Sequence, residues 1–358
     1  MNCIKRPLTV LITASGNAYM PGICKSIKEN GEREIRLIGA DINNDDTILE
    51  MCDAYFQVPA AKNPKYVAAL LDICKKENVN VLIPIMSAEL ETLSANRNRF
   101  EEIGTKISVS NIENLKIANN KLSLFQFLED TGFPFPNYYP VQTVADVDRA
   151  VEHIGMPIVF KATEGSGSRG MRIIDNSRSK YEMLFHEKPN SCYTSLNEFR
   201  ETLMENGGDF PEMLAMEYLP GNEYTVDLLS DYGDVKYSMC RRGLNVQASI
   251  ILDGIVEDRP QITGMCNDIA KRLKLTGNIG FDIKERADGT PVIMECNPRA
   301  TAGVSEFVPS GVNLLYLCVK MLIGEDLPVI KPEYGIIMRR RYMEMYVKDG
   351  EQRRTKRQ

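Results

Sequence analysis

Histidine is scarce in this chain of 358 residues, which contains only His153 and His186. Histidine-based catalytic triads and metal sites with several histidine ligands are therefore nearly excluded. Nine cysteines are present, but their number is odd and no two have the C-x-x-C spacing. This usage argues against a disulfide framework or a thiolate zinc site and indicates a reducing cytosol. Any chemistry must then use carboxylates, lysine, arginine and backbone N–H groups.

Long apolar runs and an excess of positive charge are also missing. No apolar run reaches the ~18 residues that a membrane span needs, and the run LTVLIT near the N-terminus is too short for a signal peptide. The net charge of −6 gives no support for nucleic-acid binding. We therefore expect a cytoplasmic protein without membrane or nucleic-acid partners, whose basic C-terminal tail EQRRTKRQ is a frayed terminus.

The first 114 residues alternate between strand-like and helix-like segments. Apolar runs at 8–13, 35–41, 53–59 and 79–85 are separated by segments with helical spacing, which predicts a parallel α/β sheet. Residues 87–104 are predicted to form one helix, and residues 115–132 another that ends at Gly132. The loop SGNAYMPG after the first run, with Asp41 about 25 residues on, has some features of a dinucleotide site. It lacks the G-x-G-x-x-G pattern, however, so a tight turn that lines a crevice is the favoured interpretation over NAD binding.

A glycine-rich stretch, FKATEGSGSRGMRII, lies at 160–174 between two strand-like runs. It is not the familiar phosphate loop G-x-x-x-x-G-K-[ST], because Lys161 precedes the glycines and a strand, not a helix, follows them. The N–H groups of such a loop can approach phosphate oxygens that side chains could not reach. We predict that residues 164–170 are poorly ordered without a nucleotide and close over one when it binds.

The segment NIGFDIKERADGTPVIMECNPRA, residues 278–300, is predicted to be a hairpin with a two-residue turn at Asp288-Gly289. That register places Asp282 opposite Glu295, with Asn297 on the same face. Opposed carboxylates destabilise a sheet unless something offsets their repulsion, and a divalent cation with oxygen ligands does so. The alternative is an ordinary polar hairpin with a shifted register.

A strand lysine, a glycine loop and a carboxylate–carboxylate–asparagine cation site together predict an ATP site. Two other features are weaker when taken alone. Glu217 and Glu223 flank a break at Pro220-Gly221, which would usually be a solvated hairpin. Arg241 and Arg242 are adjacent on a strand, so at most one of them faces a given site.

These motifs follow one another along residues of about 115–325 in an order that resembles the ATP-grasp superfamily. The resemblance is greatest to one half of the carbamoyl phosphate synthetase large subunit and to single-copy carboxylate–amine ligases. The resemblance implies a fold of mixed α/β and α+β class. A Rossmann-like domain that precedes the ATP grasp would span 1–114. Two α+β subdomains would follow, at 115–218 with a linker helix and the glycine loop, and at 219–358 with the metal hairpin.

The resemblance also implies a role for each motif residue. Glu217, Tyr218 and Leu219 would form the adenine hinge, and Glu223 would meet the ribose hydroxyls. Arg299, Lys161 and Arg241 are the predicted catalytic residues, with Arg299 facing the transferring phosphoryl group. The ligands of Mg²⁺, or alternatively Mn²⁺, would be Asp282, Glu295 and Asn297. The nucleotide phosphates would be held by Lys121, Lys161, Gly165, Ser166, Gly167, Ser168 and Gly170.

The function that the resemblance implies is an ATP-dependent, ADP-forming ligase that joins a small-molecule carboxylate to an amine or a thiol through an acyl phosphate. A small-molecule kinase and a non-catalytic nucleotide-binding protein are the alternatives. The intact set of motif residues argues against the second, and a homodimer is left open. With one copy of the fold and no glutaminase, we expect a product other than carbamoyl phosphate. Two departures from the family are the short Asp282, where many relatives carry Glu or Gln, and the long segment 186–211.

Overall fold

The computed structural model of the chain describes residues 5–163, 170–187, 192–247, 250–341 and 344–346. Its contacts divide the chain into two compact units. The first comprises Met1–Ala118, Tyr224–Asp282 and Cys296–Gln358, and the second comprises Asn119–Glu223 and Ile283–Glu295. Each unit is described by itself.

The first unit begins with the parallel sheet that the sequence predicts. Its strand order is β3-β2-β1-β4-β5, and all neighbouring pairs are parallel. The order reverses direction at β1, so the crevice beyond the carboxyl ends of β1 and β4 is the topological switch point. The strands are β1 Leu8–Thr13, β2 Ile35–Asp41, β3 Ala54–Gln57, β4 Val81–Ile83 and β5 Lys106–Ile107.

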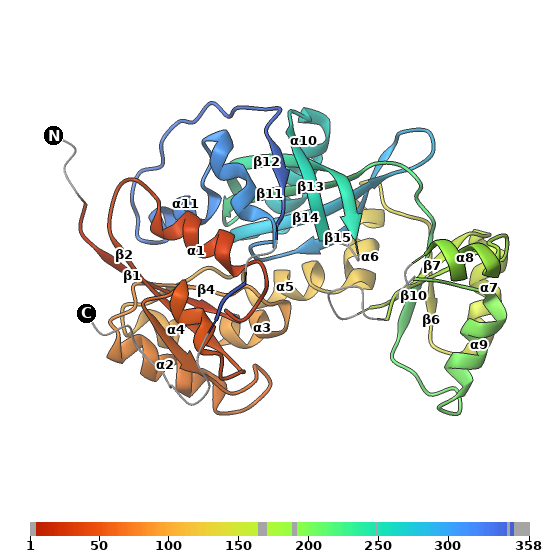
Figure 1. The fold of residues 1–358 in the computed structure, drawn as a ribbon, viewed down its shortest axis with the longest axis horizontal. Coiled ribbons are helices and arrows are strands. Elements are labelled where there is room, and N and C mark those ends of the chain that lie inside the picture. The colour runs from red at the N-terminus through yellow and green to blue at the C-terminus, as the bar shows by residue number, and fades with distance from the viewer. Residues whose placement is uncertain (1–4, 164–169, 188–191, 248–249, 342–343, 347–358) are drawn as a thin grey trace. The chain divides into compact units, whose positions relative to one another are not determined.

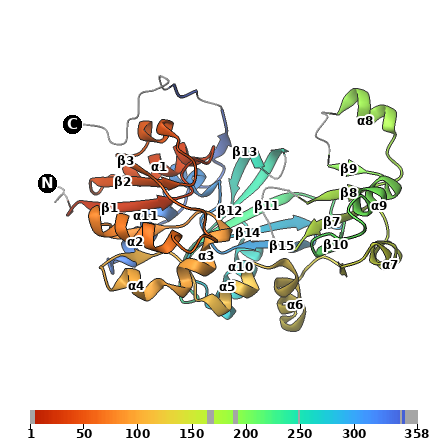
Figure 2. The same cartoon turned by 90° about the horizontal axis from the view of Figure 1, so that it is seen from below.

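Helices cover both faces of this sheet (Figures 1 and 2). Side chains of α2 and α4 pack with Leu11, Ile38 and Leu82 on one face, and those of α1 and α11 pack with Val10 and Ile12 on the other. No helix in the described part of the chain is long and apolar enough to cross a membrane. The helices are α1 Met20–Lys28, η1 Asp46–Glu50, α2 Tyr66–Lys76, α3 Ser87–Ala95, α4 Arg97–Glu101 and α5 Ile112–Ala118.

Two expected helices are each broken in two. The segment predicted as one helix over 87–104 divides into α3 and α4 at Asn96, whose φ of −111° and ψ of 10° leave the helical region. The segment predicted over 115–132 divides into α5 and α6, because Asn120 caps α6 by accepting the N–H of Ser123. Gly132, with φ of 75°, ends α6 as the sequence predicts.

The first unit also contains most of a second sheet, of order β15-β14-β11-β12-β13-β16. Leu229, Met239 and Val256 of this sheet join α1 and α11 in one apolar core. The strands are β11 Glu223–Asp231, β12 Asp234–Gln247, β13 Ile250–Glu257, β14 Gly277–Glu285, β15 Pro291–Asn297 and β16 Ile337–Arg339. The helices that accompany it are α10 Pro260–Arg272, η2 Val304–Ser310 and α11 Leu314–Leu322.

The second unit is built on a smaller sheet of order β6-β10-β7-β8-β9. Its core joins Phe160 and Ala215 of the sheet to Val147 and Phe199 of two helices. The strands are β6 Tyr138–Val141, β7 Ile158–Ala162, β8 Arg172–Ile174, β9 Tyr193–Thr194 and β10 Met213–Glu217. The helices are α6 Lys121–Thr131, α7 Val144–Ile154, α8 Lys180–His186 and α9 Leu196–Met204.

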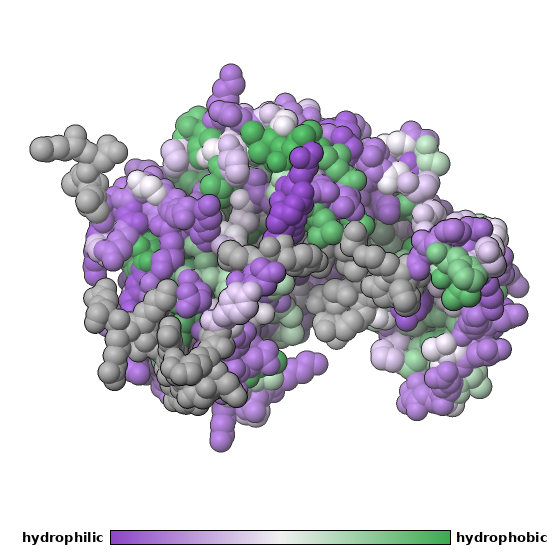
Figure 3. Space-filling view, viewed as in Figure 1, coloured by the Kyte–Doolittle hydropathy of each residue, from purple (hydrophilic) through white to green (hydrophobic). Residues whose placement is uncertain are grey.

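Helix α8 exposes apolar side chains in the long segment between the glycine loop and the hinge. Tyr181, Leu184 and Phe185 are 65%, 72% and 62% exposed, and Figure 3 shows an apolar patch over α8. The rings of Tyr181 and Phe185 contact each other, with centroids 4.6 Å apart. This helix therefore contributes nothing to the core of the second unit.

Candidate functional site

The second unit brings together Lys121 and Glu295, which the sequence assigns to a phosphate and to a metal ion. Lys121 is the first residue of α6, directly after its cap. Its Nζ lies 3.2 Å from Glu295 Oε1 on β15, and the two side chains are only 9% and 26% exposed. Because an ammonium group and a carboxylate that are this close and this sheltered interact strongly, the pair fixes both groups at one point.

Lys161 lies on β7, as predicted, and the glycine stretch connects β7 to the antiparallel strand β8. The register of β7 and β10 places Lys161 opposite Leu214. At the far end of the loop, Gly170 adopts φ of +70° and its carbonyl accepts the N–H of Ala162 at 3.2 Å. Gly165, Ser166, Gly167 and Ser168, and with them the predicted loop closure, lie outside the described residues.

The predicted hinge follows β10. Glu217 Oε1 accepts hydrogen bonds from Arg286 Nη2 at 2.6 Å, Arg286 Nε at 3.0 Å and Asn137 N at 3.1 Å. The Glu217 side chain is therefore occupied within the protein. Leu219 is 3% exposed, and no hydrogen bond joins its backbone to any residue that the structure describes. A buried backbone N–H and C=O without partners are costly, so they suit a ligand with a matching edge.

The remaining hinge residue, Tyr218, and the predicted ribose residue, Glu223, both have polar neighbours. The hydroxyl groups of Tyr218 and Tyr193 lie 3.4 Å apart. Burial, followed by the hydrogen bond to Tyr218, raises the pKa of Tyr193 to about 12. Glu223, assigned to the ribose, lies 3.9 Å from Lys284 through Oε2. That distance is at the outer limit of an ion pair, so Glu223 is held loosely.

In the first unit, a chain of hydrogen bonds joins Arg299 to Asp282. Arg299 Nη2 donates to Asn297 Oδ1 at 3.0 Å, and Asn297 Nδ2 donates to Asp282 Oδ2 at 3.0 Å. Thr225 Oγ1 donates to Asp282 Oδ1 at 3.1 Å. Asp282 and Asn297 therefore lie on one face of the sheet, as the sequence predicts.

Arg299 reaches the switch point of the parallel sheet. Its Nε donates to Ser87 Oγ, 3.3 Å away, at the start of α3. Glu89 fixes this turn, because its Oε1 accepts the N–H groups of Ile85 and Met86 at 3.1 and 3.0 Å. Burial raises the pKa of Glu89, and hydrogen bonds from Tyr66 and other donors oppose the rise. No sequence motif identifies Glu89, which resembles any glutamate at the start of a helix.

Arg241 lies in the interior of the first unit. Its side chain is 5% exposed, and its Nη1 lies 2.7 Å from Asp227 Oδ2 while its Nε lies 3.4 Å from Glu306 Oε2. Burial alone would lower the pKa of Arg241, but the charges of Glu306 and Asp227 outweigh it and raise the pKa. Arg242, by contrast, donates to Glu257. The two adjacent arginines therefore face opposite sides, as predicted.

The network around Arg241 contains residues that the sequence analysis missed. Thr301 Oγ1 donates to Asp227 Oδ1 at 2.7 Å, and Arg340 Nη2 lies 2.7 Å from Glu306 Oε1. A Cβ on Gly303 would come within 2.4 Å of Arg241 Cζ, so only glycine leaves room for the guanidinium. Close packing of this kind has no sequence motif, although the glycine is a weak hint.

The predicted two-residue turn at Asp288-Gly289 is wrong. Gly289 N–H donates to Arg286 O at 3.0 Å and Arg286 N–H donates to Thr290 O at 2.9 Å, so three residues form the loop. Asp288 Oδ1 accepts the N–H of Thr290 at 2.9 Å, and only Gly289 adopts a positive φ, of +84°. One left-handed glycine and one Asp cap favour the longer loop over a turn that needs two left-handed residues.

The side-chain oxygen atoms of the predicted metal ligands, Asp282, Glu295 and Asn297, suit a hard cation. In the described part of the chain, no group of three or more His, Cys, Asp or Glu side chains could hold a metal ion. The predicted set differs, because it combines the carboxylates Asp282 and Glu295 with the amide of Asn297. Half a turn of that amide would exchange its Nδ2 for Oδ1 on the side of Asp282. The donor chemistry therefore fits Mg²⁺, which prefers oxygen ligands.

Models of known families match nearly the whole chain in consecutive segments. Residues 120–206 match the ATP-binding domain of the carbamoyl-phosphate synthase L chain. Residues 209–343 match an ATP-grasp family in the biosynthetic pathway with Ter operon, and residues 10–108 match the N-terminal domain of PylC-like proteins. The chain has an ATP-grasp fold. It resembles one half of a carbamoyl phosphate synthase large chain.

Two relatives are large chains of carbamoyl phosphate synthase. That of Methanobrevibacter smithii is 25% identical over 165 residues, which is 46% of this chain and 15% of the relative. That of Clostridium acetobutylicum is 22% identical over 333 residues, which is 88% of this chain and 28% of the relative. The chain thus spans less than a third of the length of these relatives.

Solved structures share the fold at low identity. An ADP complex of N5-carboxyaminoimidazole ribonucleotide synthetase has a TM-score of 0.69 at 16% identity, covering 94% of this chain and 82% of its own. The biotin carboxylase domain of Hydrogenobacter thermophilus 2-oxoglutarate carboxylase has a TM-score of 0.66 at 17% identity, and the match covers 92% of this chain and 73% of that domain. An L-amino acid ligase from Bacillus licheniformis has a TM-score of 0.63 at 16% identity, and the match covers 89% of this chain and 75% of the ligase. These likenesses establish the fold alone.

Proposed function

We propose that the chain is an ATP-dependent, ADP-forming ligase that joins a small-molecule carboxylate to an amine, or to a thiol, through an acyl phosphate. The observation that carries the proposal is the placement of the motif residues. Lys121 lies 3.2 Å from Glu295, and Arg299 is hydrogen-bonded to Asn297 and through it to Asp282. Glu295 and Asn297 are two residues apart on β15, so the two sets are adjacent along one strand.

The hinge would bind adenine through its backbone. The N–H and C=O of Leu219, which have no partner among the described residues, offer the donor and acceptor that an adenine edge requires. Glu223 would accept hydrogen bonds from the ribose hydroxyls. The phosphates would contact Lys121, Lys161 and the glycine stretch that ends at Gly170.

Asp282, Glu295 and Asn297 would hold Mg²⁺, or alternatively Mn²⁺, which when bound offsets the negative charge of the phosphates. Lys121 would then exchange its contact with Glu295 for a phosphate oxygen. The MgADP bound to the biotin carboxylase domain and the ADP bound to the ribonucleotide synthetase support this assignment by analogy of fold.

The first reaction step is attack of a substrate carboxylate oxygen on the γ-phosphorus, with ADP as the leaving group. Arg299 and Lys161 offset charge as it spreads over the phosphoryl oxygens. In the second step the amine attacks the acyl carbon, a tetrahedral intermediate forms, and inorganic phosphate leaves. We assign Arg241 a positioning role, because its buried contacts with Asp227 and Glu306 hold the segment that follows Arg299.

The test is ADP release by the purified protein with MgATP and pairs of carboxylates and amines, using substrate carboxylates labelled with ¹⁸O. The expected result is ADP formation that needs both substrates, with one ¹⁸O atom in each free phosphate. A kinase would form ADP with the first substrate alone and leave the phosphate on its product. ATP binding without ADP formation for any pair would indicate a non-catalytic protein. The biotin carboxylase domain forms a dimer, so light scattering of the same sample tests whether this chain forms a homodimer.

A further inference from the structure

The tip of the β14–β15 hairpin packs closely against the hinge, and both belong to the second unit. Gly221 N–H donates to Glu285 O at 3.0 Å, and Glu285 N–H donates to Asn222 O at 3.0 Å. Asn222 Nδ2 also donates to Glu285 Oε2 at 2.8 Å. The hinge is therefore hydrogen-bonded to a hairpin that lies more than 60 residues further along the chain.

Gly221 makes this approach possible. A Cβ at this position would lie 2.6 Å from the Cβ of Glu285 and 2.7 Å from its carbonyl oxygen. Real side chains do not tolerate such distances, and a backbone carbonyl cannot move aside as the end of a flexible side chain could. The contact between the hinge and the hairpin is therefore built into the fold at Gly221.

Arg286 adds a charged contact to this backbone pairing. Its guanidinium donates twice to Glu217 Oε1, at 2.6 and 3.0 Å, and once to Phe135 O, at 2.9 Å. The side chains of Arg286 and Glu217 are 31% and 19% exposed, so the pair is partly sheltered from water. Hydrogen bonds between charged groups are stronger than neutral ones, and the planar guanidinium restricts their direction.

The pair also fixes the direction in which the hinge backbone continues. Glu217 N–H donates to Asn137 O at 2.9 Å, while Glu217 Oε1 accepts the N–H of the same Asn137. Glu217 is thus held on both sides, by Asn137, which directly precedes β6, and by Arg286 of the hairpin loop. Leu219, whose backbone has no partner among the described residues, follows only two residues later.

We infer that Arg286 is a positioning residue that determines nucleotide affinity and base selectivity, because it fixes the backbone of Leu219 through Glu217. The inference rests on the proposed function, since it requires that the hinge binds the base. A fixed N–H at Leu219 matches the acceptor N1 of adenine and opposes the N1–H donor of guanine. A hinge that can shift loses this discrimination. Polar sites reject a mismatched group strongly only while their own groups are held in place.

The experiment compares Arg286→Met and Glu217→Gln with the wild-type protein and with Arg242→Met. Arg242 is the matched control, because it likewise contacts a glutamate, at 2.8 Å, with similar side-chain exposures of 28% and 21%. Calorimetry measures the Kd of a non-hydrolysable ATP analogue and of its GTP counterpart, each with Mg²⁺. Steady-state ADP formation supplies KM and kcat, and thermal unfolding reports on folding.

The expected result for Arg286→Met is a Kd for the ATP analogue that rises roughly tenfold or more, as loss of charged hydrogen bonds typically causes. The preference for the ATP over the GTP analogue should fall by roughly an order of magnitude. The kcat at saturating ATP should stay within about twofold, since Arg286 stabilises no transition-state charge. Glu217→Gln should raise the Kd less than Arg286→Met does. The free-energy loss of the double variant Arg286→Met/Glu217→Gln should be smaller than the sum of the two single losses. Arg242→Met should leave all of these values unchanged.

Unchanged Kd and unchanged base preference in Arg286→Met would overturn the inference while the wild type still binds the ATP analogue. Absence of ATP binding by the wild type would instead overturn the proposed function. If Arg286→Met does not fold, Glu217→Gln decides, because its amide keeps the size and one acceptor of the carboxylate. A raised Kd with reduced base preference in Glu217→Gln then supports the inference, and a wild-type Kd overturns it.

Discussion

At the scale of single residues, the contacts of Arg299 distinguish it from Arg241 and Arg340, which both pair with carboxylates. It donates to Ser87 Oγ, Ala300 O and Asn297 Oδ1. Within the described part of the chain, it forms no ion pair with a carboxylate. An alternative interpretation of the sequence is that Arg299 pairs with Glu306, but Glu306 contacts Arg241 and Arg340 instead. The charge of Arg299 is therefore not offset by a neighbouring carboxylate, which suits contact with an anion.

Replacement of Arg299 should slow phosphoryl transfer and leave ATP affinity nearly intact. Loss of one charge-stabilising donor typically lowers the rate roughly a hundredfold to a thousandfold. Arg299→Lys should recover only part of that loss, because an ammonium group is a point charge and not a planar fork. Single-turnover ADP formation and calorimetry with ATP measure the two effects separately. Lost ATP binding with an unchanged rate at saturating ATP would contradict this role.

The residues that sequence analysis could assign are those whose chemistry depends on type and order along the chain. Lys121, Glu295 and Asn297 were identified by motif, and the structure brings Lys121 to Glu295 and Asn297 to Asp282. Arg286 and Glu89 carry no motif. Their contacts depend on chain segments 69 and 76 residues away, at Glu217 and Thr13. Such contacts are properties of packing, which no local pattern encodes.

At the scale of elements, the parallel sheet and the positions of most strands and helices were predictable, but the hairpin register was not. Arg286 pairs with Thr290 next to the turn. Continued regularly, that pairing would put Asp282 and Asn297 on opposite faces, yet their side chains are hydrogen-bonded at 3.0 Å. We infer that the register shifts by one residue along the hairpin. The correct face was therefore predicted from an incorrect turn.

Gly280 on β14 gives a test at this scale, because the strand needs glycine there. A Cβ would lie only 2.0 Å from Cγ2 of the buried Thr301, which donates to Asp227. We expect Gly280→Ala to lower the free energy of unfolding by about 1–3 kcal/mol, as overpacking typically does. The displaced Thr301 should also weaken the Arg241 network and reduce ADP formation. Urea denaturation measures the stability.

The control for this substitution is Gly264→Ala. Gly264 lies inside α10, where an added Cβ would meet nothing within 4 Å. Alanine is the better helix former, so this variant should gain about 0.5–1 kcal/mol. A neutral or stabilising Gly280→Ala would contradict the close approach of β14 to Thr301.

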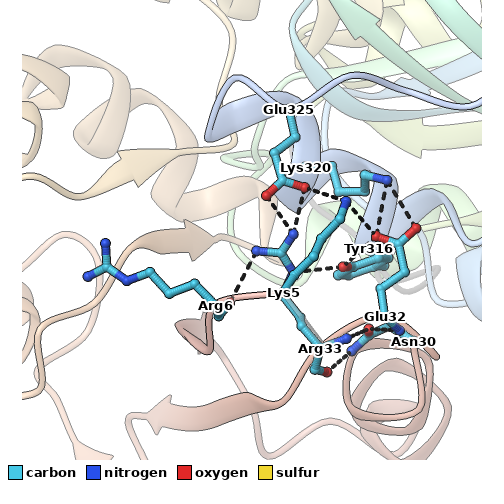
Figure 4. A network of polar contacts seen from close by, with 8 residues as sticks. All are labelled: Lys5, Arg6, Asn30, Glu32, Arg33, Tyr316, Lys320 and Glu325. Atoms are coloured by element: carbon cyan, nitrogen blue, oxygen red, sulfur yellow. Dashed lines mark hydrogen bonds and ion pairs between the residues drawn. The ribbon is translucent and has the colours of Figure 1, made fainter. Parts of the chain in front are cut away.

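At the scale of the whole molecule, a polar network joins distant parts of the chain within the first unit (Figure 4). Lys320 Nζ, on α11, lies 3.1 Å from each carboxylate oxygen of Glu32. Arg33 Nη2 lies 2.6 Å from both oxygens of Glu325, and its side chain is 2% exposed. Lys5 contacts both carboxylates, at 3.0 and 3.1 Å. The start of β2 and the end of α11 are thus held together by charge as well as by the apolar core.

The pKa of Glu32 makes this network testable by pH. Burial alone would raise that pKa, but hydrogen bonds from Lys5, Lys320 and Tyr316 outweigh it and lower the pKa from 4.5 to about 2. Hydrogen bonds and the charge of Arg33 and Lys5 likewise exceed the effect of burial and lower the pKa of Glu325. A carboxylate with a depressed pKa in the folded state stabilises that state fully above its unfolded pKa. The stabilisation is lost as pH falls from about 4.5 towards 2.

Glu32→Gln should therefore lower the free energy of unfolding at pH 7. It should also reduce the slope of that free energy against pH between about 4.5 and 2, because unfolding of the wild type is accompanied by protonation of Glu32 in this range. The slope should not vanish, because Glu325 contributes in the same direction. Urea denaturation at a series of pH values measures both effects. Glu29→Gln is the control, since Glu29 is 68% exposed, lies 3.8 Å from Lys25 and should contribute little. Equal slopes for Glu32→Gln and the wild type would show that Glu32 does not link protonation to the stability of this network.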